Sequence, residues 1–102
     1  MFARMTTWQV GAEHRPELER LADELSGRLS AMAGFRTATY LADDAGSRYS
    51  SLTVWDTEEA AEAAAQASAE RLRQAVVALG HEPEVQTFEL YEPLRRQRWG
   101  AI

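Results

Sequence analysis

Cysteine, lysine and asparagine are missing altogether from this 102-residue chain. Without cysteine, the chain can form no disulfide, thiolate metal site, iron–sulfur cluster or cysteine nucleophile. The same absence suits a reducing compartment, so we expect a cytoplasmic location. All eleven basic residues are arginine, and alanine is abundant. We interpret this bias as the product of a GC-rich, bacterial genome.

Long apolar runs and an excess of positive charge are missing too. No stretch approaches the ~20 apolar residues that a membrane-spanning helix needs, and the N-terminus has no apolar signal segment. The formal net charge is −5. Nucleic-acid binding needs a basic surface, which this balance does not supply. The sequence therefore predicts neither a membrane nor a nucleic acid as partner.

Hydrophobic periodicity divides the first half of the chain into three elements. Residues 2–10 read as a strand, followed by a helix with Pro16 in its first turn. Its apolar stripe extends to Met32, and Gly34 is the predicted stop. Residues 35–42 alternate as a second strand, and the sequence DDAGS at 43–47 is a strong turn signal. The turn predicts a β-hairpin with the next strand.

The second half continues with strand, helix and strand. Residues 48–55 form the predicted third strand, and Asp56 is the predicted N-cap of a helix that ends at Leu79 and Gly80. This helix is rich in alanine. Such small side chains allow either close packing on a sheet or a cleft beneath the helix. Residues 85–91 form the predicted fourth strand.

The predicted order, βαββαβ, indicates an α+β fold of the ferredoxin-like type. Its four-stranded antiparallel sheet carries both helices on one face. We assign residues 1–93 to this domain and 94–102 to a C-terminal tail that packs on a partner subunit, with Trp99 as its anchor. The uncovered sheet face still carries large apolar side chains, so we expect a homodimer that buries it.

Three sequence stretches resemble the dimeric α/β-barrel superfamily, and most of all the antibiotic-biosynthesis-monooxygenase-like (ABM-like) proteins. They are MAGFR at 32–36, DDAG at 43–46 and LTVWDTEEA at 52–60. The resemblance covers roughly residues 2–91. It implies two sheets packed face to face in a dimer, with a small-molecule cleft between each sheet and its own helices.

The same resemblance suggests two functions. Members of this superfamily include cofactor-free oxygenases of polycyclic aromatic compounds, haem-degrading enzymes and proteins with no known activity. We therefore expect a monooxygenase-like protein that acts on an aromatic or carbonyl substrate without a cofactor. The alternative is a non-catalytic ligand-binding or stress-associated module on the same fold, because a shared fold does not transfer function.

Haem degradation is the member activity that the sequence disfavours. The resemblance places the helical tryptophan and the iron-ligating histidine of haem-degrading members near Ala64 and Gln74 of this chain. The asparagine that those members carry on the first strand has no counterpart, because the chain contains none. We expect no specific haem binding, since no axial ligand is placed to hold the iron.

Four strand residues are the candidates for binding a substrate: Arg4, Tyr40, Tyr49 and Trp55. Tyrosine hydroxyls orient ligands in aromatic pockets, and a buried arginine needs a counter-charge or an anionic ligand. Each candidate has a structural alternative. The aromatic residues, with Trp8, suit a core or a subunit interface, and the strand arginines, which include Arg36 and Arg48, suit ion pairs.

The two histidines, His14 and His81, fall in predicted loops. Neither has a second ligand at metal-binding spacing, so we expect no metal and interpret both as solvated. No general base stands out in the sequence, and the catalytic residues stay unassigned.

Overall fold

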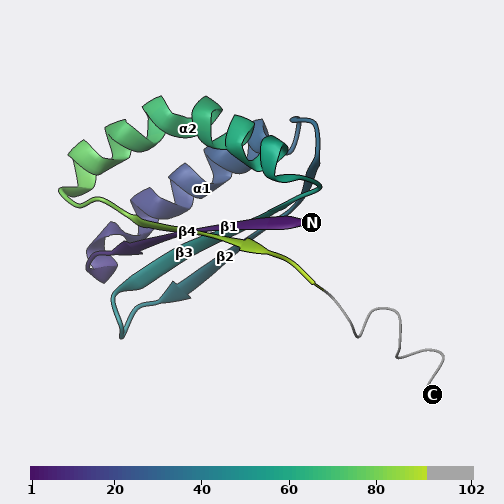
Figure 1. Ribbon diagram of the computed structural model, residues 1–102. Helices are drawn as coiled ribbons and strands as arrows, with labels where there is room; N and C mark the ends of the chain where they lie inside the picture. The colour runs from purple at the N-terminus through teal and green to yellow at the C-terminus, as the bar shows by residue number, and fades with distance from the viewer. Residues whose placement is uncertain (92–102) are drawn as a thin grey trace, which may run out of the picture.

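The computed structural model describes residues 1–91 and shows one antiparallel sheet with two helices packed on one of its faces (Figure 1). The sheet order is β2-β3-β1-β4, and every neighbouring pair of strands is antiparallel. This is the predicted ferredoxin-like arrangement. The elements are β1 (Phe2–Gln9), the 3-10 helix η1 (Ala12–His14), α1 (Arg15–Leu29), β2 (Phe35–Asp43), β3 (Arg48–Trp55), α2 (Glu58–Leu79) and β4 (Glu84–Glu89). The predicted tail at 94–102 lies outside the described residues.

Helix α1 is shorter than predicted. It begins at Arg15 with Pro16 in its first turn, but it ends at Leu29, where Ser30 is the C-cap. Met32 lies beyond the helix, in a turn closed by its amide and the Leu29 carbonyl at 3.0 Å. Gly34 is not the helix stop but a residue of the entry into β2, with φ at +83°.

Helix α2 ends where the sequence predicts, but its N-cap differs from the predicted residue. Gly80, at φ +74°, is its left-handed C-cap. The N-cap is Thr57, whose side-chain oxygen accepts the Ala60 amide at 3.1 Å. Asp56, predicted as the cap, instead accepts a 2.5 Å hydrogen bond from Arg36 Nε.

A β-bulge at the start of β2 changes which residues face the helices. Simple alternation puts Phe35 on the face opposite to Tyr40. The register shift between Phe35 and Thr37 places Phe35 directly across from Trp55 instead. Their rings meet edge to face, with centroids 5.4 Å apart and planes at 82°. Phe35 therefore packs under the helices beside the fully buried Trp55.

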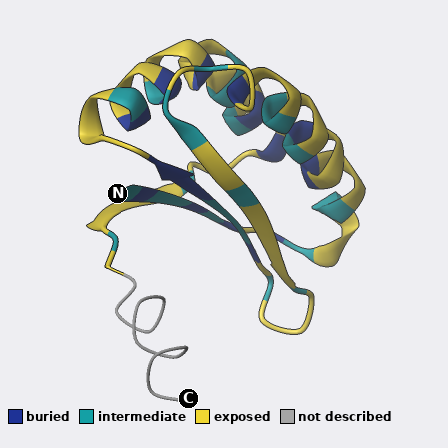
Figure 2. Cartoon of the chain, turned by 90° about the vertical axis from the view of Figure 1, so that its right-hand side faces the viewer, coloured by how far each residue is buried: buried dark blue, intermediate teal, exposed yellow. Residues whose placement is uncertain are grey.

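Buried residues lie on the sheet and on both helices (Figure 2), and those of the core form two hydrophobic clusters. The cluster near the start of α1 contains Trp8 and Tyr49, and the one near its end contains Leu29 and Trp55. Burial of these side chains is the main contribution to stability. Residues of both clusters also border the cavity described below.

No helix in residues 1–91 covers the other face of the sheet, which nevertheless carries apolar side chains. Leu41 of β2 is 51% exposed there, and Phe88 of β4 is 45% exposed. Met5 and Leu52, paired across β1 and β3, share this face. We refer to it as the open face.

Within residues 1–91 no helix has the length and apolar character needed to span a membrane.

Candidate functional site

A cavity of about 230 Å³ lies between the sheet and the two helices. Its floor is the helix-facing side of the two central strands, β1 and β3. Alternation along those strands points every second side chain toward the helices. The floor residues are Arg4, Thr6, Trp8, Tyr49, Ser51, Thr53 and Trp55.

The roof of the cavity is almost entirely aliphatic. Helix α1 contributes four leucines at helical spacing, and α2 contributes a stripe of small residues with one leucine. Of the small residues, Ala64 is buried and Ala65 is half-buried. The side chain at position 65 therefore leaves room beneath α2, while Ala61, which is 3% exposed, packs outside the cavity in the core.

The cavity opens between α1 and the edge strand β2. Four of its lining residues on these two elements are exposed: Glu19, Tyr40, Leu41 and Ala42. The remaining lining residues on the central strands and on α2 are buried or half-buried. The mouth of the cavity therefore lies at the β2 edge, beside α1.

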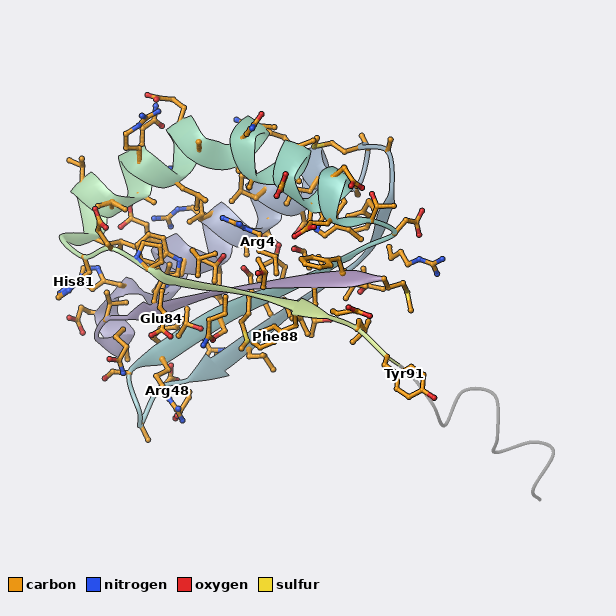
Figure 3. All side chains as sticks on the ribbon, in the orientation of Figure 1. Arg4, Arg48, His81, Glu84, Phe88 and Tyr91 are labelled. Atoms are coloured by element: carbon orange, nitrogen blue, oxygen red, sulfur yellow. The ribbon has the colours of Figure 1, made fainter. Side chains whose placement is uncertain are left out.

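Arg4 is the charged residue of the cavity floor. Its half-buried side chain projects from β1 into the space under the helices (Figure 3). Burial lowers the pKa of its guanidinium, and no hydrogen bond or neighbouring charge within residues 1–91 offsets that effect. Charge taken out of water without a partner costs free energy. An anion bound in the cavity would compensate this charge.

Tyr49 is buried in the cavity wall, but its hydroxyl points away from the ligand space. The hydroxyl donates to Asp44 Oδ1 at 2.6 Å. This hydrogen bond, together with burial and the charge of Asp44, raises the pKa of Tyr49 to about 12. The bond from Tyr49 is also the main cause that lowers the pKa of Asp44. At neutral pH Tyr49 is thus a neutral phenol. Its O–H already donates a hydrogen bond to Asp44, so it is not available to a ligand.

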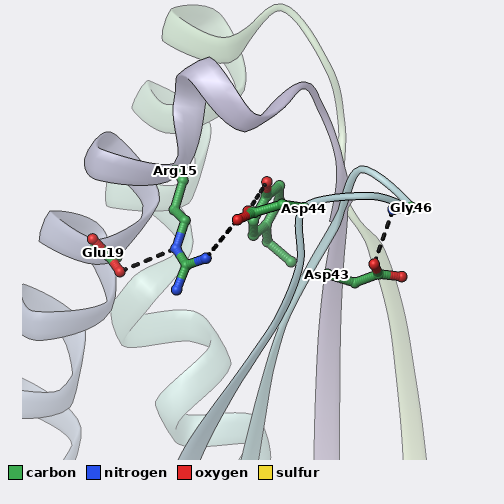
Figure 4. Close-up of polar contacts among 6 residues, drawn as sticks. Arg15, Glu19, Asp43, Asp44 and Gly46 are labelled. Carbon is green, nitrogen blue, oxygen red and sulfur yellow. Dashed lines mark hydrogen bonds and ion pairs between the residues drawn. The ribbon is translucent and has the colours of Figure 1, made fainter.

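Arg15 connects the hairpin turn to helix α1 at one end of the mouth. Its Nη1 donates to Asp44 Oδ2 at 2.9 Å, and its Nε donates to Glu19 Oε2 at 3.3 Å (Figure 4). Asp43 Oδ1 holds the turn itself by accepting the Gly46 amide at 2.9 Å. Helix and hairpin are therefore joined by ionic contacts on one side of the opening.

Tyr40 forms a second connection between the same two elements. Its hydroxyl donates to the Ala22 carbonyl at 3.2 Å and lies 2.5 Å from Ser26 Oγ. Ser26 itself donates to the Ala22 carbonyl at 2.7 Å. The mouth is thus flanked by the Arg15–Asp44 contact and the Tyr40–Ser26 contact.

Of the residues singled out from the sequence, the structure gathers Arg4, Tyr40, Tyr49 and Trp55 around one cavity. Trp55 is 0% exposed, and its Nε1 donates to Thr53 Oγ1 at 3.0 Å, so it also serves as core. Trp8 lines the same cavity and is 5% exposed.

The other candidates lie elsewhere. Arg36 pairs with Asp56, and Arg48 pairs with Asp43 at 3.0 Å, which confirms the ion-pair interpretation for both. His81 is exposed, and His14 lies 3.7 Å from Glu13. Residues 1–91 contain no group of three or more side chains suited to hold a metal ion.

Sequence reasoning missed four polar residues of the site: Thr6, Arg15, Asp44 and Ser51. Asp44 was interpreted only as part of a turn, and its partner Arg15 lies 29 positions away. No local pattern joins such distant residues. The two hydroxyl residues follow from alternation once the strands are paired, because Thr6 lies directly across from Ser51.

Comparison with known proteins places this geometry in a family context. Residues 1–69 match the sequence profile described as Antibiotic biosynthesis monooxygenase. No curated protein matches the chain. Among solved structures, a monooxygenase of Streptomyces coelicolor in complex with nanaomycin D aligns with a TM-score of 0.74 at 23% identity, over 89% of this chain and 88% of that one.

Two further structures show the same fold with different functions. A cofactor-independent oxygenase of Streptomyces nogalater aligns with a TM-score of 0.69 at 21% identity, over 89% of this chain and 93% of that one. A haem-degrading protein of Mycobacterium tuberculosis aligns with a TM-score of 0.66 at 22% identity, over 89% of this chain and 94% of that one. At such identities the likeness concerns the fold alone.

Proposed function

Since this chain belongs to the antibiotic biosynthesis monooxygenase family, we propose that its cavity binds a small aromatic or carbonyl molecule and promotes its oxidation by O₂ without a cofactor. The observation that carries the proposal is the guanidinium of Arg4, which has no ion-pair partner within residues 1–91 and lies on the cavity floor beneath an aliphatic roof. A cation in such surroundings stabilises an oxyanion far better than it would in water. The similarity to the cofactor-independent oxygenase of Streptomyces nogalater supports the cofactor-independent route.

The chemistry requires a substrate whose carbon becomes electron-rich when a proton is lost. A phenol such as 1-naphthol loses its hydroxyl proton, and the charge spreads from the oxygen to the para ring carbon. That carbon forms a bond to O₂, and the peroxide then gains a proton and loses water to give the 1,4-quinone. The balance is C₁₀H₈O plus O₂ giving C₁₀H₆O₂ plus H₂O. Oxygen is the only oxidant required.

The described side chains of the cavity assist by binding and by charge rather than by taking the proton. Tyr49 is protonated at neutral pH and donates to Asp44. Glu19 lines the mouth and pairs with Arg15. The proton therefore leaves to water through the mouth, and Arg4 holds the resulting anion. This restricts the substrate to acidic phenols and enolisable ketones.

Oxygen uptake with 1-naphthol tests the proposal. We expect the wild-type protein to form 1,4-naphthoquinone faster than buffer, with one atom of ¹⁸O₂ in the product, and Arg4→Gln to lose most of that rate. Arg20→Gln is the matched control, because Arg20 is exposed on α1 and does not line the cavity. Quinone formation at the same rate in wild type, Arg4→Gln and buffer would show that the proposal is wrong.

A non-catalytic binding role is the second candidate. It is favoured by one observation: Glu19, at the mouth, is the one carboxylate among the described lining residues, and no histidine is among them. Such a protein would bind a ligand such as nanaomycin D, which the Streptomyces coelicolor monooxygenase binds, but it would leave the ligand unchanged. Saturable binding of both nanaomycin D and 1-naphthol without oxygen uptake distinguishes this role.

We also propose that the open face pairs with a second copy of the chain. The supporting observations are the exposed Leu41 and Phe88 and the pairing of Met5 with Leu52 between them. The face also carries opposite charges, with Arg48 on β3 and Glu84 on β4 (Figure 3). A two-fold axis through the face would place apolar centre on apolar centre and allow such charges to meet at its rim. A stable interface of this kind buries more than ~1,000 Å².

A further inference from the structure

The floor of the cavity holds adjacent polar side chains that the oxidation of a phenol does not by itself require. Arg4 of β1 lies directly across from Thr53 of β3, and the next helix-facing pair on the same strands is Thr6 and Ser51. All of these residues line the cavity. One cation and several hydroxyls thus lie side by side on the two central strands, beneath an aliphatic roof.

Two of the three hydroxyls are free to bind a ligand. Thr53 Oγ1 already accepts the Trp55 indole at 3.0 Å and lies 3.5 Å from the Arg4 carbonyl. Thr6 and Ser51 make no side-chain hydrogen bond to any of residues 1–91, although Thr6 is only 8% exposed. Among the described residues, no side-chain nitrogen or oxygen atom is both fully buried and without a hydrogen-bond partner, so these two hydroxyl oxygens are not fully buried. Both therefore face accessible space, and the space that they line is the cavity.

The charge balance of the cavity leaves one positive charge without a partner. Its charged lining residues within the described part of the chain are Arg4, Arg15 and Glu19. Arg15 is matched by Glu19 and Asp44 at the mouth. Among these three residues, Arg4 alone has no counter-charge within residues 1–91, and desolvation lowers its pKa. Since arginine stays protonated in proteins, a bound anion is the natural way to compensate it.

We propose that Arg4, Thr6 and Ser51 form a carboxylate subsite, so that the ligand of this cavity is an aromatic carboxylic acid in its ionised form. A single guanidinium matches a monoanion, and its planar fork fits the two oxygens of a carboxylate. The two hydroxyls supply donors for the remaining lone pairs. A phosphate dianion would need a second cation, which the floor does not provide.

The size and walls of the cavity set the rest of the ligand. An apolar cavity of about 150 Å³ admits benzene, so about 230 Å³ accommodates one or two rings. The leucines of α1 line the roof above such a ring system, and Trp8 lines the floor beneath it. This inference rests on the proposed function in that both place an aromatic ligand in the same cavity. It adds that the ligand already carries one negative charge, its carboxylate, before any oxidation. The ring oxygen is neutral in that bound state and can accept from the N–H groups of Arg4 that the carboxylate leaves free.

Calorimetric titration with 2-naphthoate and 2-naphthamide tests the charge requirement, because the two have nearly the same shape. At neutral pH we expect the wild-type protein to bind the acid at least about tenfold more tightly, as expected when a charged hydrogen-bonded partner is added. Arg4→Gln should remove this preference, and Arg4→Lys should retain part of it. Arg20→Gln, on the exposed side of α1, should behave as wild type.

Variants of the two hydroxyls provide a test that leaves the charge in place. Thr6→Val and Ser51→Ala should each weaken binding of 2-naphthoate several-fold and leave binding of 2-naphthamide nearly unchanged. They also decide the question if Arg4→Gln does not fold. Equal affinity of wild type for acid and amide would overturn the carboxylate subsite while leaving the proposed function standing. Absence of binding by either compound, with no oxidation of 1-naphthol, would overturn both.

Discussion

The phenol of Tyr49 donates a 2.6 Å hydrogen bond to Asp44 Oδ1, and this contact ties the wall of the cavity to the hairpin turn. Asp44 is the common acceptor of two donors, since Arg15 of α1 reaches its other oxygen at 2.9 Å. One carboxylate thus joins the turn both to strand β3 and to helix α1. The contact raises the pKa of Tyr49 and lowers the pKa of Asp44, and both shifts can be measured.

Titration of the tyrosines should reveal this contact. The chain has three tyrosines, and Tyr49 should ionise at about 12 because its hydroxyl donates a hydrogen bond to Asp44, whose charge also disfavours a second negative charge nearby. The absorbance of phenolate near 295 nm should therefore show a late step that disappears in Tyr49→Phe. In Asp44→Asn the step should move toward the ordinary value of about 10. A single transition near pH 10 for all tyrosines would contradict the hydrogen bond.

The same shift predicts how stability changes at high pH. The folded-state pKa of Tyr49 is raised, so the unfolded chain loses this proton first as pH increases. The contribution of Tyr49 is fully present below about pH 10 and is lost as pH rises toward about 12. Urea unfolding across this window should therefore show a smaller loss of stability in Tyr49→Phe than in wild type.

Two alanines of α2 should respond in opposite ways to enlargement. Ala61 is 3% exposed in the core, so Ala61→Leu should overpack it and cost about 1–3 kcal/mol. Ala65 lines the cavity, so Ala65→Leu should fill empty space with little loss of thermal stability and should block ligand binding. Melting temperature and 2-naphthoate titration together distinguish the cases. Equal, large losses of melting temperature would mean that no space exists beneath position 65.

Charge on the open face should disrupt self-association. Phe88→Glu and Leu41→Glu each place a carboxylate where the proposed homodimer buries an apolar side chain, and burial of an unpaired charge is costly. We expect light scattering to give a mass of twice 11.4 kDa for wild type and 11.4 kDa for either variant at micromolar concentration. Val77→Glu is the control, because Val77 is 82% exposed on α2. A wild-type monomer under these conditions would refute the dimer.

Haem should bind weakly and without a defined stoichiometry. Position 64 lies under α2 in the cavity and is alanine, while position 74 is an exposed glutamine, so α2 offers no axial ligand at either place. His81 follows the helix and is exposed. Titration with haem followed by a reductant is the measurement. A sharp Soret band at one haem per chain, lost in His81→Ala and bleaching on turnover, would contradict this expectation.

The sequence predicts the bounds of an element well where two kinds of local pattern agree: the hydrophobic periodicity within the element and the turn or cap residues at its ends. The third strand was predicted with the bounds that the structure gives, 48–55, because strict alternation is preceded by turn residues and followed by a helix start. The predicted end of α1 was wrong because Met32 continues the apolar spacing of the helix, although it lies beyond the last helical residue. It reaches the cluster around Trp55 from a turn instead.

The candidate site was predictable as far as alternation extends. The alternation within each strand was readable, but the register between Tyr40 and Tyr49 was not. The pairing of the strands places both tyrosines, and Arg4 of β1, on the helix-facing side of the sheet. The Arg15–Asp44 pair could not be foreseen, since it depends on where α1 crosses the hairpin. The error in the N-cap of α2 has a similar cause. Arg36 lies at the bulge of β2 and forms an ion pair with Asp56, so the carboxylate of Asp56 does not cap the helix.

Gly34 bears on ligand size although it lies outside the cavity. A Cβ at this position would come within 2.7 Å of Ala60 Cβ, and its φ of +83° independently favours glycine. Its carbonyl also accepts the Asp56 amide at 2.8 Å, just before α2 begins. Gly34 thus lets the backbone that enters β2 pass close to the first turn of α2. We expect a larger residue at position 34 to push the two apart, tilt α2 relative to the sheet and so change the height available to a flat ring, without any substitution in the cavity wall.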